Sequence, residues 1–203
     1  GIDSGFWLPE ARAPHDELRI LFCGRLHWHK GVQVLLEALA STEVPYDVLI
    51  LGQGPEEARV RWLLAQWEKR RPRSRGQNVS LMTRRVSRDA LRSIRQQSDV
   101  QIVPSVPTSQ WREQMNLSML EGMACGLPVI GSRSGGIPEG VGDGGLIVTP
   151  DRPGELTEAI EFYALHNEER ELAGRRARER VLRYYGLVEN GNALAAVYAG
   201  VTA

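Results

Sequence analysis

The chain has 203 residues, with 25 basic and 25 acidic side chains, so its formal net charge is zero at pH 7. This balance argues against a protein that binds nucleic acid through a strong positive field. Two cysteines do not make a disulfide framework, which favours a reducing, cytoplasmic compartment. No run of eighteen apolar residues occurs, so the sequence predicts no membrane-spanning helix.

Short apolar runs alternate with longer segments of helical periodicity. The runs predict six strands, at residues 19–26, 46–54, 78–86, 99–105, 128–135 and 145–150. Helices are predicted at residues 30–41, 55–71, 88–98 and 115–126, with two or three more from Pro153 to the end. The alternation indicates an α/β fold: a Rossmann-like parallel sheet of about six strands, flanked by helices on both faces.

Three parts are expected along the chain. Residues 1–18 read as an interdomain linker from a longer protein, because the chain does not begin with Met and this stretch has no strand or helix pattern. Residues 19–185 form the Rossmann-like domain, and residues 186–203 form a C-terminal helix. In such sheets the ligand lies beyond the carboxyl ends of the strands, so functional residues are expected in the loops after the strands.

The loop after the first predicted strand reads GRLHWHKG, with Arg25 near its start and Lys30 near its end. Two cations beside the N-terminus of a helix suit a diphosphate, because free backbone N–H groups add to their positive charge. A pair of solvated surface cations is the plainer alternative.

Three other patterns give weaker signals. His27 and His29 are of a metal-ligand type, but no cysteine or carboxylate is spaced to complete a site. The sequence GQGPEE at residues 52–57 lacks the third glycine of a dinucleotide fingerprint. Residues 68–76, EKRRPRSRG, are basic. The simpler interpretation is a solvated helix end, and the more specific alternative is contact with a membrane surface.

The segment EQMNLSMLE, residues 113–121, predicts the start of a helix. Asn116 is a good N-cap, so the helix should begin at about Leu117. The backbone N–H groups of Asn116, Leu117 and Ser118 would then be free at the rim of the sheet, where an anion such as a phosphate binds well.

The same segment begins with Glu113 and ends with Glu121. Each could accept hydrogen bonds from sugar hydroxyls beside the phosphate, and two solvated acids are the alternative. A separation of eight residues along a helix spans about 12 Å, whereas the two carboxylates of a retaining glycosidase lie about 5 Å apart. A glycosidase pair is therefore not expected.

Taken in order, these segments resemble the C-terminal, donor-binding domain of retaining glycosyltransferases of family 4, which have the GT-B fold. The resemblance runs almost from end to end of the chain. It is carried by ILFCGRLHWHKGVQVLLEAL, LILGQGPEE and LEGMACGLPVIGSRSGGIPEGVGDGGLIV. Glu113 and Glu121 match the paired glutamates of the family's motif.

The resemblance implies a role for the matched residues on the diphosphate and sugar side. Arg25 and Lys30 would hold the donor diphosphate, with Gly24 beside them. Glu113 would contact the transferred sugar near its reacting centre. Glu113, Arg25 and Lys30 are therefore the predicted catalytic residues.

It also implies the residues that bind the rest of the donor. The helix start at Asn116, Leu117 and Ser118 would meet the distal phosphate. Glu121 would bind the ribose hydroxyls, and the loop at Arg85 and Val86 would border the base.

The function implied is retaining transfer of a hexose from a nucleotide-diphosphate sugar, without a cofactor or metal. UDP is the first expectation for the nucleotide, with GDP and ADP as alternatives. An N-terminal domain outside this sequence would hold the acceptor, so the chain alone should transfer sugar poorly. A cytoplasmic location, with contact at the inner membrane face, is expected. The alternative is a non-catalytic nucleotide-sugar-binding or regulatory module with the same fold.

Overall fold

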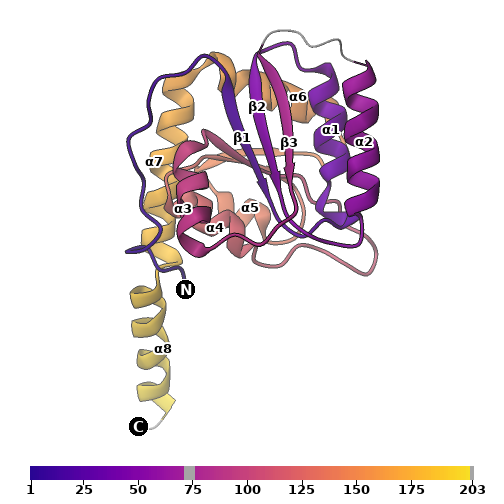
Figure 1. The fold of residues 1–203 in the computed structure, drawn as a ribbon. Helices are drawn as coiled ribbons and strands as arrows, with labels where there is room; N and C mark the ends of the chain where they lie inside the picture. Colours follow the sequence, from indigo (N-terminus) through magenta and orange to yellow (C-terminus); the bar gives the residue numbers. More distant parts are fainter. Residues whose placement is uncertain (71–75, 202–203) are drawn as a thin grey trace.

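The computed structural model describes residues 1–70 and 76–201, which contain one six-stranded parallel sheet with the strand order β3-β2-β1-β4-β5-β6 (Figure 1). The strands are β1 (Leu18–Cys23), β2 (Tyr46–Leu51), β3 (Gln77–Met82), β4 (Val100–Val103), β5 (Val129–Ser132) and β6 (Gly145–Val148). The chain reverses its direction of winding between β1 and β4, which pair side by side in the middle of the sheet. The predicted fold class is confirmed.

Helices cover both faces of the sheet (Figure 1). They are α1 (Val32–Ser41), α2 (Glu57–Arg70), α3 (Arg88–Gln97), α4 (Leu117–Ala124), α5 (Ile137–Val141), α6 (Pro153–Leu165), α7 (Asn167–Tyr184) and α8 (Leu187–Val201), with a 3-10 turn at Trp28–Lys30. On one face α1 packs against α2 and α6, and on the other α4 packs against α7. Each face has its own apolar cluster.

The strand pattern follows from burial. Every residue of β4 and β5 is buried, because helices cover both of their sides, and such strands read as continuous apolar runs. The predicted strands begin within about one residue of the observed ones, but they extend into the loops that follow them. In the first loop, for example, Leu26 is fully buried although it lies beyond the last residue of β1. A buried loop residue cannot be distinguished from a strand residue by its polarity alone.

No helix was predicted between residue 126 and Pro153, and that prediction is wrong. Residues Ile137–Val141 form the short helix α5. Pro138 lies in its first turn, where a proline is tolerated because the N–H it lacks has no partner there. Ile137 and Val141 are fully buried, so packing on β5 and β6 stabilises a helix that Gly140 disfavours.

The N-terminus of the chain lies against the C-terminal end of α7 (Figure 1). The N–H of Ile2 donates to Tyr185 O, and Trp7 is only 2% exposed. Residues 1–17 therefore pack on the domain along much of their length. The predicted C-terminal helix begins at Leu187 and, as α8, projects away from the sheet (Figure 1).

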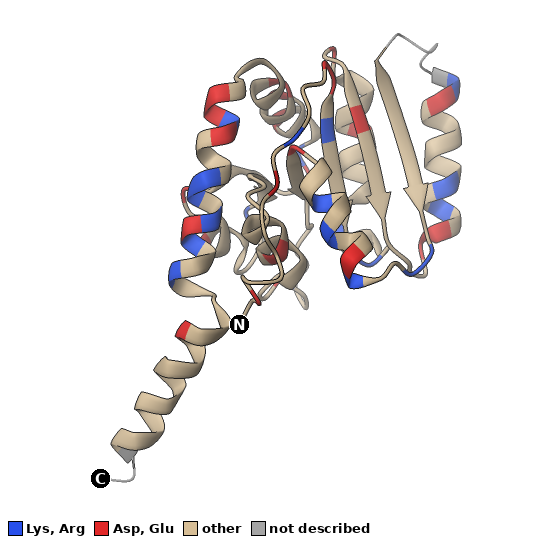
Figure 2. Ribbon diagram, turned by 60° about the vertical axis from the view of Figure 1, so that its left-hand side comes forward, with Lys and Arg blue, Asp and Glu red and all other residues tan. Residues whose placement is uncertain are grey.

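Helix α8 differs from the other long helices in its surface. Its one charged residue is Glu189, whereas α7 carries charges along its length (Figure 2). Its large apolar side chains are exposed: Leu187, Val188, Leu194, Val197 and Tyr198. Across the described ranges, no helix has both the length and the apolar character needed to cross a bilayer. The centre of the basic segment 68–76, residues 71–75, lies outside those ranges.

Candidate donor-binding site

A pocket of about 410 Å³ opens at the carboxyl ends of β1 and β4, where the winding of the sheet reverses. In open α/β sheets this is the usual position of a ligand. Residues from three segments meet there, namely the end of β1, the loop after β4 and the first turn of α4. They include most of the predicted site: Gly24, Arg25, Lys30, Glu113, Asn116, Leu117 and Ser118.

The loop after β1 is held against the loop after β4 by a close backbone contact. Gly31 has φ +76, and a Cβ atom at this position would lie 1.9 Å from Pro104 O. Only glycine fits such a conformation and such an approach without strain. The contact places Lys30 beside the segment that carries Glu113.

Glu113 lies in the wall of this pocket, although it is charged and only 7% exposed. Lys30 Nζ donates to both of its carboxylate oxygens, at 2.9 Å and 2.6 Å, and Ser105 Oγ donates to Oε2 at 2.8 Å. A buried carboxylate needs such partners, because its removal from water is costly. Ser105 was not among the predicted site residues, since a serine after a strand has no distinctive pattern.

The backbone of Glu113 is supported from the loop after β5. The N–H of Gly136 donates to Glu113 O at 2.9 Å. Gly135 has φ +54, and a Cβ atom there would lie 1.7 Å from the same carbonyl oxygen. The glycine pair thus lets the two loops touch, which fixes the position of the glutamate.

The first turn of α4 forms the remaining wall. The side chain of Asn116 accepts a hydrogen bond from the N–H of Met119 at 3.0 Å, so the predicted cap and helix start are confirmed. The N–H groups of Leu117 and Ser118 have no acceptor within the helix and carry the positive end of its dipole. Ser118 Oγ donates to Cys23 O at 3.0 Å, which ties this turn to the end of β1.

Arg25 differs from Lys30 in its surroundings. Its side chain is exposed at the rim of the pocket, and among the described residues it has no ion pair or side-chain hydrogen bond. Together with Lys30 and the start of α4, it makes one side of the pocket positive. This arrangement can bind an anion of diphosphate size.

Three predicted site residues lie outside the lining of this pocket. Glu121 is one turn further along α4, where its carboxylate pairs with Arg95 Nη2 at 2.7 Å. Arg85, which is exposed, and Val86, which is half-buried, lie in the loop between β3 and α3. The structure therefore gathers the diphosphate and sugar side of the predicted site, whereas the residues expected at the ribose and base stand apart from it.

An aromatic stack borders Lys30 and was not predicted. The rings of His27 and His29 stack at 3.9 Å, and His29 stacks on Trp111 at the same distance. Lys30 Nζ lies 5.1 Å from the Trp111 ring, which allows a cation–π contact. Burial lowers the pKa of His29 below its ordinary value, and the charges of His27 and Lys30 lower it further. The described part of the chain has no group of three side chains placed to bind a metal.

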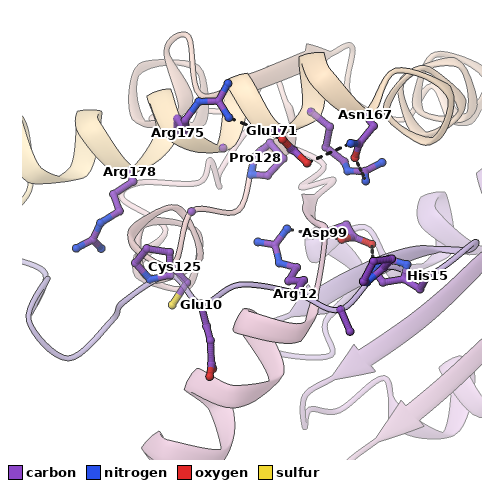
Figure 3. Close-up of a pocket in the computed structure, with 16 residues that line it drawn as sticks. Glu10, Arg12, His15, Asp99, Cys125, Pro128, Asn167, Glu171, Arg175 and Arg178 are labelled. Carbon is purple, nitrogen blue, oxygen red and sulfur yellow. Dashed lines mark hydrogen bonds and ion pairs between the residues drawn. The ribbon is translucent and has the colours of Figure 1, made fainter.

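A larger pocket, of about 560 Å³, lies at the opposite end of the sheet, between the N-terminal segment and α7 (Figure 3). Its cations already have acceptors. Arg178 Nη1 donates to Trp7 O at 2.8 Å and to Ala124 O, and Arg170 Nη1 donates to Tyr163 O at 2.6 Å. Burial also raises the pKa of the Cys125 thiol in its wall to about 11.

Asp99 is the centre of the charged contacts in this second pocket (Figure 3). It accepts from the backbone N–H of Arg19 at 2.8 Å, and it pairs with Arg12 Nη1 at 3.6 Å and His15 Nε2 at 3.3 Å. Burial lowers the pKa of Arg12, while Asp99 acts against that shift. These contacts fasten residues 9–15 to the sheet, and they leave few free donors for a ligand.

Comparison with known proteins shows which family the sequence matches. A family model described as "Glycosyl transferases group 1" matches residues 17–164. The D-rhamnosyltransferase WbpZ of Pseudomonas aeruginosa is 31% identical over 163 residues, which cover 79% of this chain and 39% of that protein. The chain spans less than half the length of the curated relatives it matches.

Solved structures of other proteins share the fold of this chain. Sucrose-phosphate synthase from Thermosynechococcus elongatus superposes with a TM-score of 0.84 and 25% identity, over 100% of this chain and 51% of that one. Alr3699/HepE of Anabaena, solved in complex with UDP, gives a TM-score of 0.80 at 18% identity, over 98% of this chain and 56% of that one.

Proposed function

The chain belongs to the group 1 glycosyl transferases, and we propose that it is the donor-binding domain of a retaining enzyme that transfers a hexose from a nucleotide-diphosphate sugar. One observation carries the proposal. Arg25, Lys30, Glu113 and the free N–H groups at the start of α4 converge on one pocket at the point where the winding of the sheet reverses.

The diphosphate is proposed to lie between the two cations and α4. When the bond between the anomeric carbon and the phosphate oxygen breaks, negative charge develops on the diphosphate. Arg25, Lys30 and the N–H groups of Leu117 and Ser118 would stabilise that charge, which lowers the barrier to departure. This stabilisation comes from the chain's own residues, and we propose that the transfer needs no metal.

Glu113 is proposed to face the transferred sugar. Its carboxylate lies within the pocket, next to the cation that would hold the diphosphate. There it can accept hydrogen bonds from the sugar hydroxyls and stabilise positive charge at the anomeric carbon. The new bond to the acceptor oxygen would form on the face from which the diphosphate leaves, so that the configuration is retained. In this proposal Glu113 forms no covalent bond.

UDP is the nucleotide we propose. HepE, which shares the fold, has been solved with UDP and with UDP-glucose. Gly24 would lie beside the diphosphate, and Arg85, Val86 and Glu121 would bind the remainder of the donor. GDP and ADP are the alternatives that a titration separates.

The acceptor is proposed to bind to a further domain of the whole protein, because the chain spans less than half of its relatives. Exposed apolar side chains on α8 are suited to contact such a domain. On this proposal the chain alone binds the donor but transfers sugar poorly. A non-catalytic nucleotide-sugar module is the other candidate; the presence of Arg25, Lys30, Glu113 and Glu121 together favours the enzyme.

Calorimetric titration of this chain with UDP, GDP and ADP tests the proposal. One nucleotide should bind, and Lys30→Ala and Glu121→Ala should each weaken it by about tenfold or more, because each removes a charge-assisted hydrogen bond. Arg175→Ala, on the far side of the molecule, is the matched control and should bind as the wild type does. Absence of binding by a well-folded wild-type chain would overturn the proposal.

A further inference from the structure

Arg95 is a cation in the interior of the domain. It lies near the end of α3, its side chain is 0% exposed, and it is among the largest fully buried side chains. A guanidinium without water needs partners of opposite charge or hydrogen-bond acceptors. Its partners therefore indicate what the side chain does.

Those partners belong to α4. Arg95 Nη2 lies 2.7 Å from Glu121 Oε2, and it donates to Ser118 Oγ at 3.1 Å and to Ser118 O at 3.3 Å. Glu121 and Ser118 are both residues that the proposed function assigns to the donor. One buried cation thus connects two of them.

The other side of the guanidinium rests on the N-terminal segment. The Trp7 ring lies 4.5 Å from its central carbon, and this indole is itself buried. Such stacking suits a planar guanidinium, and a lysine cannot reproduce it. The position of Arg95 is therefore fixed from two directions, by α4 and by Trp7.

Stability alone does not explain an arginine at this position. Its Nε and Nη1 atoms have no hydrogen-bond partner among the described residues. Replacing a buried ion pair by apolar side chains of similar size is often neutral or stabilising. The guanidinium can instead orient Glu121. It binds one of the two carboxylate oxygens, while the Glu121 side chain remains 27% exposed.

We propose that Arg95 is the positioning residue for the donor ribose: by holding Oε2 of Glu121 and the first turn of α4, it directs the other carboxylate oxygen toward the two ribose hydroxyls. This inference rests on the proposed function and extends it to a residue that touches no ligand. Trp7 contributes by supporting the guanidinium from beneath.

Two probes separate this role from a general structural one, UDP and 2′,3′-dideoxy-UDP. The wild-type chain should prefer UDP by about tenfold or more, because hydroxyls bound to a carboxylate make charge-assisted hydrogen bonds. In Arg95→Met the ratio of the two dissociation constants should fall to about one. If UDP does not bind, the same pair of probes is made with the guanine or adenine nucleotide that does.

The ratio is the right quantity because Arg95→Met also removes a buried cation and lowers stability. Both constants are measured on one sample, so a partly unfolded population affects them equally. Arg95→Lys is the second variant; it keeps the positive charge but lacks the planar guanidinium that stacks on Trp7, so an intermediate ratio is expected. Arg92→Met, one turn earlier on α3, is the matched control and should keep the wild-type ratio.

The double variant Arg95→Met with Glu121→Gln should lose no more ribose preference than Glu121→Gln alone, because Arg95 acts through Glu121. A wild-type ribose preference that survives in Arg95→Met would overturn the inference and leave the proposed function intact. A wild-type chain that binds no nucleoside diphosphate would overturn both.

Discussion

The two ends of the sheet hold pockets that look alike in charge and differ in what the charges already bind. At the amino ends of the strands, Arg12, Arg170 and Arg178 all donate to backbone carbonyl oxygens. At the carboxyl ends, Arg25 has no such partner among the described residues, and Lys30 donates to the carboxylate of Glu113. The larger pocket therefore has fewer donors to offer to a ligand.

The difference follows from how each end is built. At the amino ends, the N-terminal segment has no strand or helix and must be fastened to the domain, and Arg12 and Arg178 do this by donating to backbone carbonyl oxygens. At the carboxyl ends, the loops fasten one another through close backbone contacts at Gly31 and Gly135. These glycine contacts join the loops without using the cations to cap backbone carbonyls, so pocket volume alone is a poor guide to the binding site.

The largest effect is expected from Arg178→Met at the amino end. The guanidinium donates to the carbonyl oxygens of Trp7 and Ala124, and the variant leaves these acceptors without a partner. The free energy of unfolding should fall by about 2 to 3 kcal/mol, as measured by urea denaturation. Arg175→Met, whose side chain is 63% exposed, is the control and should change it by less than about 0.5 kcal/mol.

The affinity of Arg178→Met for UDP should equal that of the wild type at a temperature where both are folded. A loss of affinity as large as that of Lys30→Ala would show that the two ends are coupled, and the contrast between them would then be one of degree.

A smaller effect, of opposite sign, is expected from Glu113→Gln at the carboxyl end. The carboxylate competes with the diphosphate for Lys30, and its charge repels an anion in the same pocket. Its neutral analogue should therefore bind UDP about three- to tenfold more tightly, as measured by calorimetry. Glu171→Gln, beside Arg175 in the other pocket, is the control and should have no effect. Weaker binding would mean that Glu113 holds Lys30 in its binding position.

Much of the carboxyl-end pocket was predictable because parallel strands bring their following loops to one edge. Arg25, Lys30 and Asn116 could be placed there from the order of strands and loops alone. The six strands were predictable for a related reason: residues buried on both sides form apolar runs that are easily recognised.

Arg95 could not be predicted as a buried residue. It lies in RDALRSIRQQ, a polar helix whose arginines look equally solvated in the sequence, and only the tertiary structure places one of them beneath α4. Helix α5 was missed for the opposite reason, since Gly140 and the glycines on either side of the helix obscure a segment that packing stabilises. Gly135 acts through a contact with another loop and Ser105 through a contact across its own loop, and such contacts have no local pattern.

The smallest effect concerns the pH dependence of the stack beside Lys30. The pKa of His29 is lowered in the folded chain, so the unfolded chain binds the proton more readily between that value and the ordinary 6.5. The stability that neutral His29 provides is therefore complete above pH 6.5 and is lost as the pH falls through the lowered pKa. Between pH 7.5 and pH 5.5, unfolding should become easier in the wild type by a larger margin than in His29→Gln.

Histidine NMR checks the same point directly. The imidazole resonance that disappears in His29→Gln should titrate below pH 6.5 in the wild type. A resonance that titrates above 6.5 would mean that Glu113 outweighs burial and the charges of Lys30 and His27. In that case the carboxyl-end pocket would hold one more cation near neutral pH, and its contrast with the amino end would be sharper at low pH.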